Sequence, residues 1–241
     1  MVNTKERLLK EGGDRALDPR ATPAVEDYAK TIYKLQERDR RVSTAALAVR
    51  LGVTAGSVSA MLHRMDELGY VRHVRYQGVE LTQSGRRLAL AVLLRHRLLE
   101  LFLVRALGLS WDRVHEEAEV LEHALSAELE EVIAGWLGDP VRDPHGDPIP
   151  TRDGRVVEEP TVSLAHLGPG TAGELVRVSD FDPAVLRHLD QRGIALGDRV
   201  EVLGREPFGG PFVVRVEGSR GSAVHRLGPE LAAILRVRPA G

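Results

Sequence analysis

The 241-residue chain contains no cysteine, which excludes disulfide bonds, thiolate zinc sites and thiol nucleophiles. It also lacks any run of about 18 apolar residues that could span a membrane. Residues 1–6 provide no apolar core of the kind that a secretory signal peptide needs. No internal repeat, phosphate-binding loop or dinucleotide-binding fingerprint is present. We therefore expect a cytoplasmic protein without a membrane partner.

The formal net charge of −2 at pH 7 gives little reason to expect generic binding to nucleic acid. The distribution of charge along the chain gives a different indication. Twelve arginines and only five acidic residues lie between positions 38 and 107, whereas acidic residues dominate from 112 to 159. A basic module beside an acidic one predicts a local surface for a polyanion on an otherwise neutral protein.

The first half of the chain has the element order of a DNA-binding domain. After an N-terminal extension over residues 1–21, we expect helices over 22–37, 44–50 and 54–69 and strands over 70–76 and 79–81. Ser43 and Thr54 are typical N-cap residues, and Gly52 and Gly69 are typical helix ends. Two short helices joined by a tight turn form a helix-turn-helix, and a hairpin directly after them forms a wing. We therefore predict a winged helix-turn-helix DNA-binding domain over residues 22–88.

The second half divides into a helical part, a linker and a part rich in strands. We expect helices over 82–107, 110–124 and 127–136, a proline-rich linker or strap over 141–160, and strands over 174–178, 198–203, 212–216 and 234–237. The first of these helices is too apolar for one protomer to bury, which predicts a dimer face formed by Leu90, Leu94, Leu98, Leu101, Phe102 and Leu103. His145, in the linker, is expected to be an ordinary loop residue. The last 70 or so residues suit a small β-barrel. The fold class is mainly α with small β parts.

Imidazoles and carboxylates recur at helical spacing in the helical part. His96 and Glu100 are one turn apart, and a second helix carries His115, Glu119, Glu122 and His123 within an arc of about 100°. Nitrogen and oxygen ligands that face one point are what a divalent metal needs. Such residues are often only solvated side chains on the exposed face of a helix, but here the arc borders an apolar stripe on the same helix. Burial of uncompensated charge is costly, and a metal ion offsets that cost.

The third helix and the wing carry the candidate contacts with DNA. The short donors Thr54, Ser57 and Ser59 lie near the start of the helix, and Arg64 lies two turns further on. The wing supplies Arg72, Arg75 and Gln77. These side chains suit phosphate and base-edge contacts, although ordinary surface solubility would explain the arginines equally well. Because few long polar side chains lie at the helix start, readout of shape and phosphate is expected to dominate.

The order of these elements resembles the diphtheria toxin repressor family of metal-dependent transcription regulators. The resemblance covers about residues 22–238 and is carried by four motifs: Glu26-Asp27-Tyr28-x3-Ile32-Tyr33, Arg95-His96-Arg97-Leu98-x-Glu100, Val114-His115-x-Glu117-Ala118-x3-Glu122-His123 and Asp143-Pro144-x-Gly146-x-Pro148-Ile149-Pro150. It implies a helical metal-binding and dimerisation domain over residues 89–140 and an SH3-like (FeoA-like) domain over 161–241.

The resemblance implies two metal positions. One is formed by Asp27, Glu119, Glu122 and His123, and the other by His96, Glu100 and His115. In the iron-responsive branch of the family, sulfur ligands occupy the positions of Asp27 and Glu119, whereas the manganese-responsive branch has carboxylates there. Hard oxygen ligands favour Mn²⁺, although Fe²⁺ and other divalent metals remain alternatives because raw affinity rises from Mn²⁺ through Fe²⁺ to Zn²⁺.

Two positions qualify the resemblance. Manganese-type relatives without a barrel have a bridging glutamate where this chain has Lys30, and an ammonium group cannot ligate a metal. A closely coupled two-metal site is therefore not expected. Asp182 lies near the place where the barrel of some relatives supplies a ligand, but we interpret it as a helix N-cap.

The resemblance implies a regulator of metal-ion transport and homeostasis genes that binds palindromic operators in double-stranded DNA as a metal-loaded homodimer. The alternatives are an iron(II)-responsive repressor and a winged-helix sensor of small molecules that uses no metal. A metallohydrolase is a rival from another class, but the chain has no His-Glu-x2-His signature and no identified catalytic residue. We therefore expect a protein that is not an enzyme.

Overall fold

The structure is a computed structural model that describes residues 20–37, 41–74, 78–179 and 182–240. The chain divides into two compact units, the first of residues 1–95 and 125–131 and the second of residues 96–124 and 132–241. Each unit is described by itself. The expected N-terminal extension lies almost entirely outside the described residues.

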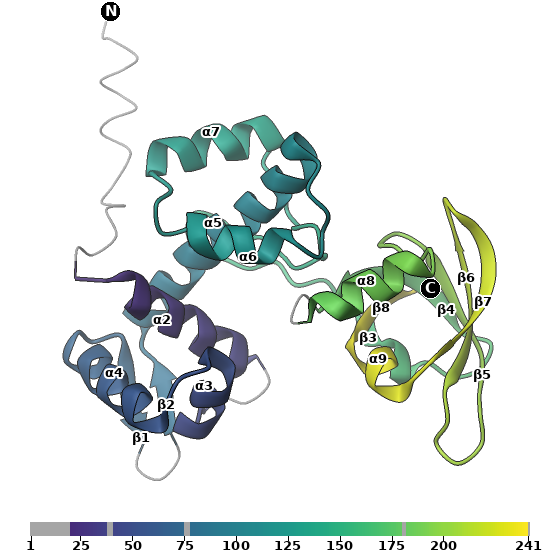
Figure 1. The fold of residues 1–241 in the computed structure, drawn as a ribbon, viewed down its shortest axis with the longest axis horizontal. Coiled ribbons are helices and arrows are strands. Elements are labelled where there is room, and N and C mark those ends of the chain that lie inside the picture. Colours follow the sequence, from purple (N-terminus) through teal and green to yellow (C-terminus); the bar gives the residue numbers. More distant parts are fainter. Residues whose placement is uncertain (1–19, 38–40, 75–77, 180–181, 241) are drawn as a thin grey trace, which may run out of the picture. The chain divides into compact units, whose positions relative to one another are not determined.

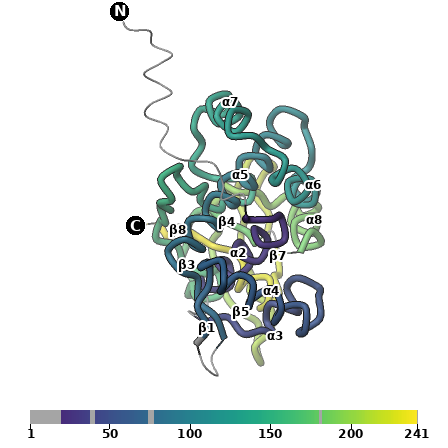
Figure 2. Tube along the Cα trace, turned by 90° about the vertical axis from the view of Figure 1, so that its left-hand side faces the viewer, coloured from purple at the N-terminus to yellow at the C-terminus, as the bar shows by residue number. Residues whose placement is uncertain are grey.

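The first unit begins with three helices whose ends follow the predicted capping residues. Helix α2 is Pro23–Gln36, α3 is Thr44–Leu51 and α4 is Ala55–Glu67. The Ser43 side chain accepts a hydrogen bond from the Ala46 amide, and Gly52 ends α3 in the left-handed conformation (φ 66°). Helices α3 and α4 pack side by side at 110° to each other, which is the expected helix-turn-helix (Figure 2). Their buried apolar side chains include Leu47, Leu62 and Met65.

A two-stranded wing follows the helix-turn-helix (Figure 1). Strand β1 (Val71–Val74) pairs antiparallel with β2 (Gly78–Leu81), and Arg72 lies opposite Glu80. Val42, just before α3, forms two backbone hydrogen bonds with Val79, which adds a third short strand segment to the wing. Strand β1 begins at Val71, one residue later than predicted, and β2 begins at Gly78, one residue earlier than predicted. Residues 75–77 lie outside the described part of the chain.

The remaining helices differ in part from the predicted ones. Helix α5 is Gln83–Leu107, α6 is Val114–Leu121 and α7 is Ala127–Leu137. Helix α6 is shorter than predicted, because a turn precedes it and the chain leaves the helix at Glu122. The apolar residues expected to form a dimer face are instead buried or half-buried within the single chain: Leu90, Leu94, Leu98, Leu101, Phe102 and Leu103.

The C-terminal part of the second unit is a six-stranded antiparallel sheet in the order β3-β8-β4-β5-β6-β7. Its strands are β3 Val162–Ser163, β4 Ala172–Val178, β5 Arg199–Arg205, β6 Phe212–Gly218, β7 Gly221–Leu227 and β8 Leu235–Pro239, with helices α8 Pro183–Gln191 and α9 Pro229–Ile234 and a 3₁₀ turn at Leu164–His166. Leu175, Leu186 and Leu189 are among its fully buried side chains. The sequence did not predict β3, β7 or α9. Most of strand β7 is exposed, and most of its residues are polar or small on both faces. The strand therefore lacks the alternation of apolar and polar residues from which a strand is predicted.

The proline-rich segment is a docked strap rather than a solvated linker. Residues 145–150 are all buried, and Asp143 is buried with them. Gly146 has φ 85°, and a Cβ atom at this position would clash with the Val176 carbonyl oxygen. The Val178 amide donates a hydrogen bond of 2.9 Å to the His145 carbonyl. These contacts hold the strap against β4, so the carbonyl and carboxylate groups of the strap have fixed positions.

Among the described residues, no single helix has the length and apolar character needed to cross a membrane. The bent pair α3–α4 meets that test by length and composition alone.

Candidate metal centre

Two helices of the second unit present the predicted ligands to each other. His96 and Glu100 lie one turn apart on α5, and His115 and Glu119 lie one turn apart on α6. His96 and Glu100 are almost completely buried, whereas the side chain of His115 is 23 % exposed. Helix periodicity alone brings each pair to one face, but only the packing of α5 against α6 brings the pairs together.

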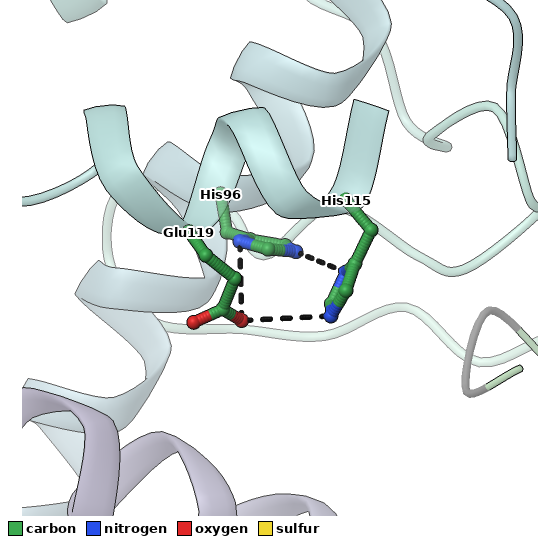
Figure 3. Close-up of side chains that lie close together, drawn as sticks. All are labelled: His96, His115 and Glu119. Atoms are coloured by element: carbon green, nitrogen blue, oxygen red, sulfur yellow. Dashed lines mark hydrogen bonds and ion pairs between the residues drawn. The ribbon is translucent and has the colours of Figure 1, made fainter. Parts of the chain in front are cut away.

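His96, His115 and Glu119 form the first cluster of candidate ligands (Figure 3). The Nε2 atom of His96 lies 3.1 Å from Nδ1 of His115. Oε1 of Glu119 lies 3.9 Å from Nδ1 of His96 and 3.6 Å from Nε2 of His115. One ligand atom from each residue falls within 4.8 Å of the others, which is close enough for a single divalent ion to contact all three.

His96 also connects the two ligand sets that the family resemblance kept apart. Its Nδ1 lies 2.5 Å from Oε2 of Glu122, which is completely buried. Its Nε2 lies 3.0 Å from Oε1 of Glu100, an oxygen that is also 3.1 Å from Nδ1 of His115. His123 contacts Oε1 of Glu122 at 3.6 Å. Within the second unit, the predicted ligands therefore form one continuous network.

A second cluster contains a residue whose role the sequence analysis missed. Glu100, Asp143 and His145 each place a ligand atom within 4.8 Å of the others, and all three residues are buried. His145 is completely buried and its Nε2 lies 2.7 Å from the Trp111 carbonyl oxygen, so the interpretation as an ordinary loop residue is wrong. The available signal was its position in a strap motif between two acidic residues, but nothing in the sequence showed that the strap would be buried.

Two buried atoms of the second cluster support a cation there. Oε2 of Glu100 and Nδ1 of His145 lie 3.8 Å apart, and neither makes a hydrogen bond with any described residue. Unsatisfied buried polar atoms are costly, and two such atoms that face each other beside Asp143 offer nitrogen and oxygen donors of the kind that a divalent metal needs. The residues present therefore fit a divalent ion bound by nitrogen and oxygen.

The charge states of this cluster reflect its burial. Burial opposes ionisation of Glu100, but the charge of His96, the polar contacts with His115 and His96 and the nearby imidazole of His145 hold the pKa of its carboxyl well below the usual range. Burial also opposes the charged form of His145, yet the nearby carboxylate of Glu100 raises its pKa to about 9. Burial and the neighbouring carboxylates of Asp147 and Glu100 raise the pKa of Asp143 to about 8. A concentration of buried carboxyl groups of this kind favours a bound cation.

Arginine side chains anchor the strap beside these ligands. Arg97, the neighbour of His96 on α5, donates a 2.5 Å hydrogen bond to the Pro148 carbonyl oxygen, and its Nε lies 3.6 Å from Oδ2 of Asp143. Arg177 of β4 lies 2.5 Å from Asp147. The ion pairs connect α5, the strap and the sheet, so they position Asp143 and His145 for the second cluster.

The structure places Asp27 on α2 in the first unit, where it is half-buried. Glu122 and His123 belong to the second unit, so the joining of Asp27 to them stays a prediction. Lys30, on the same helix, is buried with 4 % of its surface exposed. Asp182 accepts a hydrogen bond of 2.8 Å from the Ala184 amide, which confirms its role as the N-cap of α8.

The candidate DNA contacts on and just before α4 are exposed, and their roles stay predictions. The Thr54 hydroxyl caps α4 by accepting a 3.1 Å hydrogen bond from the Ser57 amide. Ser59 donates to the Ala55 carbonyl at 3.0 Å. The hydroxyl groups of Thr54 and Ser59 are thus already hydrogen-bonded to backbone groups of α4. Arg64 is exposed near the C-terminal end of the same helix.

The candidate contacts of the wing are described only in part. Arg72 is 71 % exposed and lies 3.1 Å from Oε2 of Glu80. Arg75 and Gln77 lie outside the described residues, and their roles stay predictions.

A helix-turn-helix with a wing, a helical domain with clustered nitrogen and oxygen ligands and a C-terminal SH3-like sheet together define a metal-dependent DNA-binding regulator. Three family models match the chain in this order: the iron dependent repressor N-terminal DNA binding domain over residues 21–79, the iron dependent repressor metal binding and dimerisation domain over 82–151, and the FeoA domain over 162–239.

Comparison with individual proteins gives the same result. The chain is 31 % identical to the diphtheria toxin repressor of Corynebacterium glutamicum over 206 residues, which cover 81 % of this chain and 89 % of that protein. The chain therefore belongs to the diphtheria toxin repressor family of metal-dependent, DNA-binding transcriptional repressors. This confirms the predicted family and fold class.

Other similar proteins are described as iron-dependent or manganese-dependent repressors. The iron-dependent repressor IdeR of Mycobacterium tuberculosis (strain ATCC 25618 / H37Rv) is 40 % identical over 126 residues, 52 % of this chain, and the match spans only 55 % of that protein. A solved structure described as a manganese-dependent transcriptional repressor in complex with manganese is 45 % identical, with a TM-score of 0.84, and the match covers 90 % of this chain and all of that one.

Proposed function

We propose that this chain is a manganese-responsive repressor that binds palindromic operators as a homodimer when it is loaded with metal. Its targets are metal-ion transport and homeostasis genes, and it acts in the cytoplasm as a regulator and not as an enzyme. The observation that carries the proposal is the network of His96, Glu100, His115, Glu119 and Glu122, in which nitrogen and oxygen atoms of buried and half-buried side chains converge.

The ligands that we propose form two linked groups. One contains Asp27, Glu119, Glu122 and His123, and the other contains His96, Glu100 and His115, with Asp143 and His145 beside Glu100. A divalent cation supplies positive charge and directional coordination to these side chains. Asp27 belongs to the DNA-binding domain and the remaining ligands to the second unit, so shared coordination couples occupancy to the orientation of the reading helices.

Manganese is favoured because every proposed ligand is a carboxylate or an imidazole, and hard oxygen ligands suit Mn²⁺. The structural relative with bound manganese supports the same choice. Iron(II) is the second candidate, because Fe²⁺ accepts the same donor set and the curated relatives include iron-dependent repressors.

Exposed apolar side chains support association of two copies. Val120 and Leu121 on α6 and Val132 and Trp136 on α7 are 40–73 % exposed. These residues lie in the part of the chain that matches the family model of the metal binding and dimerisation domain. Several large apolar side chains exposed to solvent there favour a contact with another protein chain. We therefore place the dimer face on α6 and α7 instead of on the buried leucines of α5.

The proposal is tested by selecting DNA from a random-sequence pool with manganese-loaded protein and measuring affinity by fluorescence anisotropy in Mn²⁺, Fe²⁺ and EDTA. Wild-type protein is expected to bind a palindromic sequence tightly in Mn²⁺ and weakly in EDTA. Asp27→Ala should lose most of this difference, whereas the control Asp66→Ala, on the exposed side of α4, should keep it. Equal affinity in all conditions would refute metal control, and tighter binding in Fe²⁺ than in Mn²⁺ would favour the iron(II) alternative.

A further inference from the structure

Glu80 stands out in the DNA-binding domain because it is a buried carboxylate that contacts two exposed arginines. Its side chain is 10 % exposed, while those of Arg41 and Arg72 are 43 % and 71 % exposed. Nε of Arg41 donates to Oε1 of Glu80 at 3.4 Å, and Arg72 donates to Oε2 at 3.1 Å. Each carboxylate oxygen therefore holds one guanidinium group.

The backbone fixes the three residues relative to one another. Arg72 and Glu80 are opposite each other in the β1–β2 register, so their side chains share one face of the wing. Arg41 comes from a separate segment, but the next residue, Val42, exchanges two backbone hydrogen bonds of 3.0 and 3.1 Å with Val79. This pairing brings Arg41 to the same end of β2 as Glu80. The arrangement thus depends on three short strand segments, not on one flexible loop.

Stability alone explains this arrangement poorly. Ion pairs with exposed arginines contribute little to stability, because solvent screens them and long side chains lose entropy. Both guanidinium groups carry positive charge and are exposed on the surface of a DNA-binding domain. Guanidinium groups match phosphate geometry, and ordering them in advance reduces the entropy that is lost when DNA binds.

We infer that Arg41 and Arg72, held by Glu80, form a clamp for a backbone phosphate of DNA. Glu80 acts as a positioning residue, since it contacts the arginines and not the phosphate. The inference rests on the DNA-binding function of the family and adds Arg41 and Glu80 to the proposed interface. Because a phosphate contact is independent of sequence, the clamp contributes to binding of any duplex.

The salt dependence of DNA binding tests the clamp. Affinity of manganese-loaded protein for a short duplex of arbitrary sequence is measured by anisotropy over a series of KCl concentrations. The slope of log affinity against log salt falls by about 0.9 for each phosphate that the protein no longer neutralises, so Arg41→Gln/Arg72→Gln should lower it by about 1.8 in a dimer. The control Arg199→Gln/Arg220→Gln removes the same charge from the C-terminal sheet domain and should leave the slope unchanged. An unchanged slope in the first variant, or an equal fall in both, would overturn the clamp.

Glu80→Gln separates positioning from simple charge. Glutamine offers one acceptor oxygen instead of two, so it can hold only one guanidinium group. Positioning predicts binding that is about two- to ten-fold weaker at fixed salt, although the variant is more positively charged. Equal or tighter binding would overturn the positioning role. If Glu80→Gln does not fold, the arginine variants still decide the matter, because both arginines are exposed. Wild-type protein that binds no duplex at all would instead refute DNA binding itself.

Discussion

Substitution of Glu122 by glutamine should remove half or more of the stability that manganese adds to the second unit. Glu122 is fully buried, and its Oε2 lies 2.5 Å from Nδ1 of His96. The amide keeps the size of the side chain and a hydrogen-bond acceptor, so the metal-free protein should change little. The neutral amide is a much poorer metal ligand than the carboxylate, so the loss should appear when manganese is present.

The magnitude follows from mass action. At a Mn²⁺ concentration 100 times the dissociation constant, binding to the folded state adds about 2.7 kcal/mol to the free energy of unfolding. If the variant binds about 10–100-fold more weakly, the same concentration adds only about 0.4–1.4 kcal/mol.

Urea unfolding followed by tryptophan fluorescence measures this difference. The chain has two tryptophans, Trp111 before α6 and Trp136 on α7, and both lie in the unit that holds the proposed ligands. The matched control is Glu117→Gln, an exposed glutamate on α6. Equal manganese stabilisation of the wild type and Glu122→Gln would refute the assignment of Glu122 as a ligand.

Three further predictions concern the strap and its cluster. Arg97→Ala should lower the free energy of unfolding by about 1–3 kcal/mol, because it leaves the buried carbonyl oxygen of Pro148 without its hydrogen bond and removes the guanidinium group beside Asp143. Gly146→Ala should cost about 2 kcal/mol or more, since an L residue at φ 85° is strained and its Cβ would clash with the Val176 carbonyl oxygen. The pKa of His145 is raised to about 9, so its imidazole must lose a proton to ligate a metal. Manganese affinity measured by calorimetry should therefore rise from neutral pH towards about pH 9 and level off above it.

Controls keep these outcomes interpretable. Arg105→Ala removes an exposed arginine from α5 and should change stability by less than about 0.5 kcal/mol. Gly135→Ala places a methyl group in open space on α7 and should not destabilise the protein. An Arg97→Ala variant as stable as its control would show that the strap ion pair contributes nothing. Manganese affinity that is flat over the pH range would remove His145 from the ligand set.

The sequence predicted the elements whose signals are local. Ser43 and Thr54 were predicted to be the N-cap residues of two helices, and their side chains do cap α3 and α4. His96 and Glu100 were predicted to share a face because helix spacing requires it. His115 and Glu119 were predicted in the same way, and the structure keeps each pair together.

The sequence did not predict features that depend on packing between distant segments. Nothing local indicates that Arg97 anchors the strap, so His145 looked like a solvated loop residue. Helix α5 is rich in apolar residues, as predicted, but Leu98 and Leu101 are buried within the single chain. The pairing of Arg41 with Glu80 depends on a bridge between residues 37 positions apart, Val42 and Val79, which periodicity cannot reveal.

The most direct test of the account is anomalous scattering at the manganese absorption edge from crystals of the manganese-loaded protein. The account predicts a manganese peak bounded by Asp27, Glu119, Glu122 and His123. A map in which these four side chains point to solvent, with no peak between them, would contradict it.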